Sequence, residues 1–483
     1  MACTTILVGS KASYDGSTII ARNDDGPFET KKMVVIGRNK QSPKYKCKIS
    51  HLEIDLPKKN YKYTSCPSVV TKRGLWPAFG INEKNVSMTA TETITSNPLV
   101  MGADPLVEYI PKTKGQKEVV GGFGEEDLLT IVLPYISSAR EGVLRVGELL
   151  EKYGTYEMNG MAFADEKEIW WLETIGGHHF IAVRVPDDRV VLMPNCFGLD
   201  YFDLKDAYSK QVNNICSKDL KKFVKDNHLD TNNNGKFNPR VIFGSHSDSD
   251  HIYNTPRSWY MLKYFNPTTY DWINNPPYSP ISDNLPFSTK PERKVTIEDI
   301  KYVLSSHYQG TEYDPYTKSD KAGLYRVIGV PNSDDSHILQ IRPYMPNELK
   351  GVEWFSLGGS GFTACIPQYA NVDNFNSFLS KTTSDVSTNY FYWTSRIIAT
   401  LVDANYKKAI LNDERYQKVT FNKSYKLLNE YDEKMLKSKN YSLCNEANDK
   451  IIEMLKKEST KTLNELMGIA SENMKTRYHR GDN

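Results

Sequence analysis

The sequence predicts an α+β protein, a layered globule of sheets and helices with a helical C-terminal elaboration. Three observations predict this fold class. Roughly the first 100 residues contain β-branched and apolar runs separated by turn residues. A helical period begins near Glu125, strands resume over residues 161–193, and residues 386–483 are strongly helical. Because sheets and helices each bury an apolar face, this order of elements favours packing in layers.

The N-terminal elements are predicted to be hairpins. Apolar runs over residues 4–9 and 17–22 flank Tyr14-Asp15-Gly16, in which Asp-Gly supplies the positive φ of a tight turn. A second hairpin is predicted over residues 78–91, with its turn at residues 82–85.

Helices are predicted from periodicity and from their end signals. The period that begins near Glu125 is expected to stop at Gly154, and Thr-Ile-Glu-Asp predicts a capped helix near Thr296. Apolar residues recur at helical spacing in two C-terminal stripes, Trp393, Ile397, Leu401 and Leu463, Leu466, Met467, Ala470. Core packing is favoured for these stripes over a partner-binding surface.

The expected organisation is one core with an appended helical region. Residues 3–385 are expected to form the core, and residues 266–294, rich in Pro and Asn, are the candidate insertion. Residues 386–483 are expected to pack on this core as helices. Hydrophobic residues make up 39% of the chain and charged residues 25%, which supports a large core and excludes wholesale disorder.

Charge and cysteine usage narrow the class of protein. Lys and Arg number 61 and Asp and Glu 59, so the net charge of +2 gives no case for nucleic acid or an anionic membrane. No stretch approaches the roughly 18 apolar residues of a spanning helix, and the N-terminus lacks the basic region of a signal peptide. Seven cysteines without a CxxC pair favour a reducing cytoplasm over a disulfide framework or a zinc site.

Cys3 is the most unusual candidate for chemistry. A buried thiol in a first strand is the common interpretation. If the residues before Cys3 were removed, however, its α-amine and its thiol would belong to one residue. An α-amine has a pKa near neutrality, about 7.7–8.0, so it can serve as the general base for its own thiol.

The second predicted strand ends in Arg22-Asn-Asp-Asp25, close to Cys3 across the hairpin. A solvated turn is one interpretation. Alternatively, Arg22 would lower the thiol pKa, and the carboxylate of Asp25 could hold the amine. Ligand-type residues at 246–251 have a spacing that fits no standard metal site, so no metal is expected there.

Residues 3–9, Cys-Thr-Thr-Ile-Leu-Val-Gly, and residues 14–25 resemble the start of the PepD-type cysteine dipeptidases. These are N-terminal-nucleophile (Ntn) hydrolases related to bile salt hydrolase and penicillin V acylase. The resemblance continues through residues 80–93, 169–174, 177–179, 184–188, 193–195, 244–247 and 253–257. It implies a four-layer αββα core, hydrolysis of small dipeptide substrates without a cofactor, and no nucleic-acid or membrane partner.

The family pattern can be placed on five residues of this sequence. Cys3 matches the nucleophile, and Arg22 and Asp25 match the Arg-x-x-Asp pair beside it. Asn195 matches an asparagine that supports the amine or the oxyanion, and Arg257 matches the arginine after Asn-Thr-Pro. The resemblance also implies a thioester acyl-enzyme. Arg22 and Arg257 supply positive field and are candidates for a bidentate grip on a substrate carboxylate, while Glu92 or Asp24 is a candidate acid for the substrate ammonium.

Two departures from the pattern matter. Both Met1 and Ala2 precede Cys3, so both must be removed on maturation for the amine to be free. The region of the second oxyanion asparagine of bile salt hydrolases reads Ala-Thr-Glu-Thr over residues 90–93, which argues against bile salts. An amidase for N-acyl amides and a non-enzymatic, secernin-like scaffold protein stay open as alternatives. Association into a homo-oligomer is an expectation by analogy alone.

Overall fold

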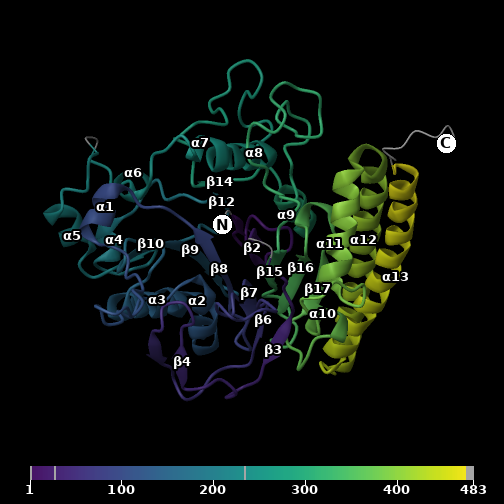
Figure 1. Cartoon of the computed structure of the whole chain (residues 1–483), viewed down its shortest axis with the longest axis horizontal. Coiled ribbons are helices and arrows are strands. Elements are labelled where there is room, and N and C mark those ends of the chain that lie inside the picture. Colours follow the sequence, from purple (N-terminus) through teal and green to yellow (C-terminus); the bar gives the residue numbers. More distant parts are fainter. Residues whose placement is uncertain (1–2, 27–28, 233–234, 475–483) are drawn as a thin grey trace.

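Two large antiparallel sheets form the centre of the protein in the computed structural model, which describes residues 3–26, 29–232 and 235–474 (Figure 1). Within these residues, the larger sheet has seven strands in the order β14-β12-β1-β2-β15-β16-β17. The bounds are β1 (Thr4–Val8), β2 (Thr18–Asp24), β12 (Val190–Met193), β14 (Ser288–Thr289), β15 (Asp335–Ile341), β16 (Gly351–Leu357) and β17 (Ile366–Tyr369). Strands β1 and β2 are fully buried, as their β-branched and apolar sequences favour.

The smaller sheet has six strands in the described part of the chain, in the order β13-β11-β10-β9-β8-β7. The bounds are β7 (Phe79–Ile81), β8 (Ser87–Thr93), β9 (Asn159–Ala164), β10 (Ile169–Ile175), β11 (His179–Arg184) and β13 (Asn214–Cys216). Alternate residues serve its two faces, since Trp171 packs in the core cluster between the sheets and Trp170 in a second cluster. Strand β2 contacts β8, β9 and β10, so the two sheets face each other.

Helices cover both sheets (Figure 1). α2 (Glu125–Val132) and α3 (Ala139–Tyr153) complete the second core cluster on the six-stranded sheet. On the seven-stranded sheet, α8 (Thr255–Phe265) contacts β12, and α9 (Ile297–Leu304) contacts β2 and β15. α11 (Phe391–Ala404), α12 (Tyr406–Ser438) and α13 (Leu443–Glu472) pack side by side beyond β16 and β17. The layers are therefore helices, sheet, sheet and helices.

Short elements connect these layers. Two small sheets pair β3 (Val34–Ile36) with β6 (Tyr63–Ser65) and β4 (Lys44–Lys46) with β5 (Glu53–Asp55). The short helices are α1 (Pro98–Ala103), α4 (Leu204–Ala207), α5 (Leu220–Asp226), α6 (Pro239–Phe243), α7 (Asp250–Tyr253) and α10 (Ser377–Ser380), with single 3-10 turns η1 (Leu133–Tyr135) and η2 (Ser360–Phe362). Among the described helices, none combines the length and the apolar sequence needed to cross a membrane.

The predicted hairpins are confirmed. β1 pairs with β2 and β7 pairs with β8, both antiparallel. The helical period from Glu125 divides into α2 and α3, and Gly154 caps α3 with a φ of +66°. The Thr296 capping box is also confirmed, because Asp299 N–H donates to the Thr296 hydroxyl at 3.1 Å and Asp299 accepts from Thr296 N–H at 2.9 Å.

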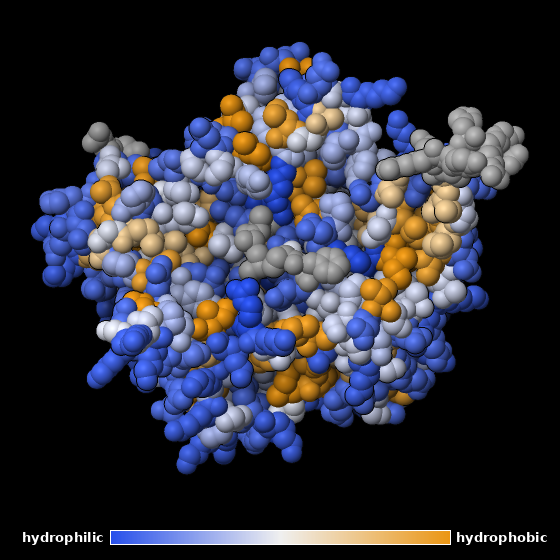
Figure 2. All heavy atoms as spheres, in the orientation of Figure 1, coloured by the Kyte–Doolittle hydropathy of each residue, from blue (hydrophilic) through white to orange (hydrophobic). Residues whose placement is uncertain are grey.

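The C-terminal stripes match the structure in part. Trp393 is buried, but Ile397 and Leu401 are half-buried, and the buried face of α11 turns toward Ile398 instead. On α13, Leu466 is buried whereas Met467 is 48% exposed. Figure 2 shows apolar patches, separated by hydrophilic residues, over the C-terminal helices on this face. Core packing therefore explains one side of each helix and leaves single apolar residues on the surface.

Candidate active site

Cys3 lies directly before β1, with its side chain completely buried. Thr5 on β1 pairs with Arg22 on β2, so side-chain alternation brings Cys3, Thr5 and Arg22 to one face of the sheet. Arg22 Nη1 lies 3.1 Å from the Cys3 sulfur and donates to it. Burial raises the pKa of the Cys3 thiol well above its ordinary value, and the positive charge of Arg22 opposes this effect. Arg22 is therefore positioned to favour a thiolate.

The Arg22 guanidinium is held on every side. Nη1 also donates to Thr91 O at 2.8 Å and to Asp24 Oδ1 at 3.1 Å. Nη2 donates to Ala90 O at 2.8 Å and to Ala78 O at 3.2 Å. A guanidinium has five N–H donors, and the contacts of Arg22 use all of them. Arg22 thus joins the two sheets at the thiol.

Asp24 is the counter-ion of this cluster. Its Oδ1 accepts from Arg22, and its Oδ2 forms an ion pair with Lys31 Nζ at 3.0 Å. Although burial opposes ionisation, Lys31 and Arg22 hold the pKa of Asp24 below its ordinary value. Both oxygens of Asp24 are therefore committed to cations of the chain.

A buried chain of side chains supports Arg22 from behind. Arg22 Nε donates to Thr89 Oγ1 at 2.9 Å, and Thr89 Oγ1 lies 2.8 Å from His337 Nε2. His337 Nδ1 lies 2.7 Å from Asp335 Oδ1, and its ring stacks on Phe79 at 4.3 Å. Burial and the charge of Arg22 lower the pKa of His337 well below its ordinary value, so the ring is neutral. Thr89 and His337 orient Arg22 whichever ring nitrogen carries the proton.

Asp25 follows β2 and pairs with an arginine that the sequence patterns did not indicate. Arg326 Nη2 lies 2.5 Å from Asp25 Oδ2. Asp25 Oδ1 is buried and has no hydrogen-bond partner among the described residues. Burial raises the pKa of Asp25, and Arg326 and Arg257 oppose that shift. One carboxylate oxygen of Asp25 is therefore available for a further donor.

Arg257 on α8 binds the backbone of the nucleophile candidate. Its Nη1 donates to the carbonyl of Cys3 and to Thr4 Oγ1 at 2.7 Å. Its Nη2 donates to Asn195 Oδ1 and to Asn254 Oδ1, each at 2.8 Å. Asn195, two residues after β12, also donates from Nδ2 to Thr93 O at 3.0 Å. Asn195 and Arg257 thus form one hydrogen-bonded unit beside Cys3.

The donors that a bidentate grip of Arg22 and Arg257 on a substrate carboxylate would need are used within the chain. With Nε donating to Tyr253 O at 2.5 Å, the five donors of Arg257 are also used within the chain. A substrate carboxylate could be held by either arginine only after these buried hydrogen bonds were broken.

Two buried glutamates complete the surroundings of the thiol. Glu92 on β8 accepts from the Thr5 hydroxyl at 2.6 Å, and Glu125 begins α2 beside β8. The charges of both raise the pKa of the Cys3 thiol, so both carboxyl groups lie within electrostatic range of it. Burial raises the pKa of Glu92 to about 7 and that of Glu125 to about 8. The sequence indicates Glu92 as a candidate acid but not Glu125, because an Asp- and Glu-rich helix start is ordinarily a capping signal.

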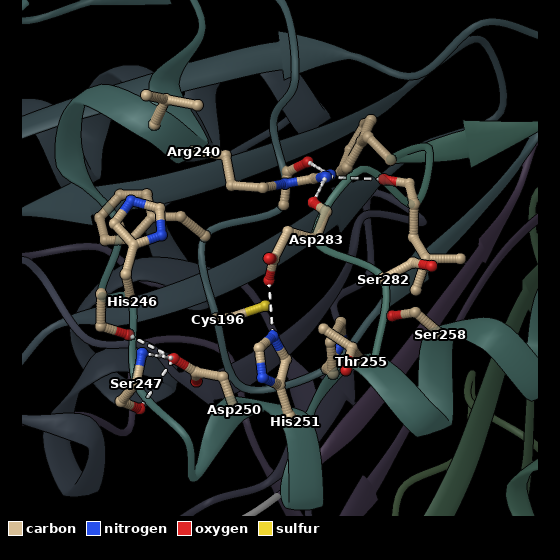
Figure 3. A pocket seen from close by; sticks show the side chains of 18 of the residues that line it. Cys196, Arg240, His246, Ser247, Asp250, His251, Thr255, Ser258, Ser282 and Asp283 are labelled. Atoms are coloured by element: carbon tan, nitrogen blue, oxygen red, sulfur yellow. Dashed lines mark hydrogen bonds and ion pairs between the residues drawn. The ribbon is translucent and has the colours of Figure 1, made fainter. Parts of the chain in front are cut away.

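A separate cavity of about 300 Å³ lies next to this cluster (Figure 3). Pro194, Cys196 and Ser258 line it, whereas Asn195 and Arg257 do not. In Figure 3, His251 reaches Asp283, with Nε2 at 2.8 Å from the carboxylate. None of the five predicted site residues lines this cavity, so it is distinct from the Cys3 cluster.

The structure therefore brings the predicted residues together around the start of β1. Cys3 contacts Arg22 and Arg257 directly. Asn195 accepts a hydrogen bond from Arg257, and the positive charge of Arg257 opposes the rise in the pKa of Asp25. Four further residues, which no sequence pattern indicates, support this set: Thr89, Asp335, His337 and Arg326. Met1 and Ala2, whose removal is predicted, lie outside the described residues.

This arrangement, a buried thiol beside Arg22 and directly before a central strand, agrees with the comparisons with known proteins. Residues 2–419 match the sequence model of peptidase family C69. The chain belongs to this family. Family C69 relatives include a dipeptidase of Bifidobacterium longum, 51% identical over 446 residues that cover 90% of this chain and 83% of the relative.

Further relatives extend over the same length. A probable dipeptidase A of Streptococcus pyogenes is 44% identical over 489 residues, covering 100% of both chains. Dipeptidase A of Lactobacillus helveticus is 42% identical over 441 residues, covering 90% of this chain and 88% of the relative. The resemblance inferred from short motifs is thus confirmed across the chain.

Proposed function

We propose that this member of family C69 is a cysteine-type dipeptidase that hydrolyses free dipeptides with Cys3 as an N-terminal nucleophile. The observation that carries the proposal is the contact of Arg22 Nη1 with the buried Cys3 sulfur at 3.1 Å, directly before the central strand β1. The names of the relatives support the substrate class. The order of helices, sheet, sheet and helices supports an Ntn-hydrolase sandwich.

Maturation removes Met1 and Ala2 and frees the α-amine of Cys3. Burial raises the thiol pKa, so the thiol needs a base close by, and the α-amine of the same residue takes its proton. Asp25, with one buried oxygen lacking a described partner, accepts a hydrogen bond from the resulting ammonium. Arg22 stabilises the thiolate, which attacks the carbonyl carbon of the peptide bond.

Attack produces a tetrahedral oxyanion, and the amide of Asn195 together with backbone N–H groups stabilises it. One such donor contributes about 3–4 kcal/mol to lowering the barrier. The ammonium of Cys3 then protonates the departing amino acid as the C–N bond breaks and a thioester forms. Water, deprotonated by the same amine, hydrolyses the thioester and restores the thiol.

The test combines intact mass and turnover. Protein expressed without an N-terminal tag is expected to have the mass of a chain beginning at Cys3 and to hydrolyse a panel of dipeptides in preference to penicillin V and conjugated bile salts. Cys3→Ser is expected to lose at least 1,000-fold in kcat/KM, because a hydroxyl is a far weaker nucleophile at neutral pH. Wild-type rates in Cys3→Ser would contradict the assignment of Cys3 as the nucleophile. Faster turnover of N-acyl amides than of dipeptides by the wild type would favour the amidase alternative.

A further inference from the structure

A free dipeptide carries an ammonium on the carbon next to the carbonyl that is attacked. From standard bond lengths, its nitrogen is about 2.5 Å from the carbonyl carbon. An ammonium is a compact charge with three N–H donors, and its burial requires acceptors and a negative charge. An acceptor for this group must therefore face the nucleophile.

The negative charges of three carboxyl groups raise the pKa of the Cys3 thiol, those of Asp24, Glu92 and Glu125. Asp24 is excluded as the acceptor because Arg22 and Lys31 occupy its two oxygens. Glu92 has one oxygen bound to the Thr5 hydroxyl at 2.6 Å and is completely buried against β1. Its Oε1 is also buried without a described partner, but Arg257 and Arg22 already place positive charge beside this carboxyl group, which disfavours a further cation.

Glu125 has one oxygen without a partner in the described part of the chain. The Thr91 hydroxyl approaches this carboxyl group and opposes the rise in its pKa, while Oε2 is buried with no hydrogen-bond partner among the described residues. The residue is only 5% exposed, so its carboxyl group is largely shielded from bulk water. Its backbone N–H donates to Glu157 Oε1 at 2.6 Å, which fixes the start of α2 at this point. A buried acid without a donor is costly unless a ligand supplies one.

A second acceptor lies beside Glu125. The hydroxyl of Thr91 on β8 is buried, approaches the Glu125 carboxyl group, and has no other partner among the described residues. Its carbonyl binds the same Arg22 nitrogen that contacts the Cys3 sulfur, which places Thr91 next to the nucleophile. Arg22, Thr91 and Glu125 therefore lie in this order outward from the thiol.

From this geometry we infer that Glu125, assisted by the Thr91 hydroxyl, binds the α-ammonium of the dipeptide and selects substrates with a free amino terminus. The inference rests on the proposed function, because it names the substrate group next to the attacked carbonyl. Glu157 and Asp24 add negative charge to this position. An N-acylated or des-amino substrate would leave the buried carboxyl without its donors and is expected to bind poorly.

Electrostatics agree with a ligand-dependent charge. Burial and the neighbouring charges of Glu157 and Asp24 raise the pKa of Glu125 to about 8, against the opposing effect of Arg22. The empty site is therefore mostly protonated at pH 7, and an arriving cation favours the ionised form. The acid becomes charged when its partner is present.

The experiment compares two substrates in one preparation, alanyl-alanine and its des-amino analogue propionyl-alanine. The ratio of their kcat/KM values does not depend on the fraction of active protein. If propionyl-alanine is not turned over, its inhibition constant against alanyl-alanine hydrolysis replaces its kcat/KM. The wild type is expected to prefer alanyl-alanine by at least 100-fold, and Glu125→Gln to reduce this preference at least tenfold. Glu125→Asp, which keeps the charge on a shorter side chain, is expected to have an intermediate preference.

Glu353→Gln is the matched control. Glu353 on β16 is also completely buried, has a pKa raised to about 8 by burial, and has one oxygen without a described partner. Unlike Glu125, it is not among the main charges that shift the pKa of Cys3. Its substitution is expected to leave the preference unchanged. An equal loss for both substrates in Glu125→Gln, partial or complete, would overturn the ammonium site while leaving the dipeptidase intact. A wild type that hydrolyses propionyl-alanine as well as alanyl-alanine would overturn both proposals.

Discussion

Arg22 and Cys3 face each other across the N-terminal hairpin, with 3.1 Å between Nη1 and the sulfur. Burial alone would keep the Cys3 thiol protonated at neutral pH. The guanidinium is the nearest compensating charge, and it is itself held by Thr89, Asp24 and carbonyls of β8. The reactivity of the thiol therefore depends on how rigidly Arg22 is positioned.

Arg22→Lys is expected to lower kcat/KM for dipeptides roughly 10- to 100-fold, because a hydrogen bond to a charged group contributes about 1.5–3 kcal/mol. Lysine keeps the charge but cannot bridge Thr89, Thr91 and the sulfur at once. The alkylation rate of Cys3 by iodoacetamide is expected to fall in parallel. Arg184→Lys is the control, since Arg184 pairs with Asp187 at 2.7 Å outside the site. Unchanged alkylation and turnover in Arg22→Lys would contradict the role assigned to the guanidinium.

Thr89→Val is expected to reduce activity through Arg22, because Thr89 contacts Arg22 and His337. The substitution leaves Arg22 Nε and His337 Nε2 without their shared partner, and each buried orphan costs about 1–3 kcal/mol. We expect a lower unfolding midpoint in urea and a lower kcat with little change in KM. Thr89→Ser, which keeps the hydroxyl, is expected to restore kcat to near the wild-type value. If Ser and Val variants have the same kcat, the hydroxyl does not position Arg22.

Much of this site could be predicted because Cys3, Arg22 and Asp25 belong to one local hairpin, in which turn residues and strand alternation determine what lies opposite what. The supporting residues could not be predicted in the same way. Arg326 is 301 residues from Asp25, and His337 is 248 residues from Thr89. Such contacts depend on how the strands are ordered in the sheets, and β15 lies beside β2 despite its distance in sequence. A short sequence motif carries no information about the order of the strands in a sheet.

Glu353→Gln is expected to change how stability depends on pH. Burial raises the pKa of Glu353 from 4.5 to about 8, while the Thr64 hydroxyl opposes this shift. The folded state therefore keeps a proton that the unfolded state releases between about pH 4.5 and 8, so wild-type stability falls as pH rises through this range. The variant lacks this contribution, which is of order 4 kcal/mol.

The measurement is the free energy of unfolding in urea at pH 5 and pH 8. The loss between these values is expected to be smaller in Glu353→Gln than in the wild type. Glu453→Gln, on an exposed part of α13, is expected to behave like the wild type at both values. An identical loss in all three proteins would show that Glu353 ionises in the folded state as readily as in the unfolded one.

Asp25→Asn separates the support of the amine from the structure of the site. Asp25 holds Arg326 through Oδ2, and its other oxygen is the expected acceptor for the α-ammonium of Cys3. Without this negative charge, the pKa of the amine is expected to fall. The acid limb of the pH profile of kcat/KM should then move to lower pH, and kcat should fall roughly tenfold because the amine is less basic and less well oriented.

Intact mass establishes first that wild type and variant both begin at Cys3. Asp187→Asn removes a carboxylate from the Arg184 pair outside the site and is expected to leave the profile in place. A lower kcat with an unmoved acid limb would mean that Asp25 acts only through Arg326, and that the amine obtains its basicity from another group.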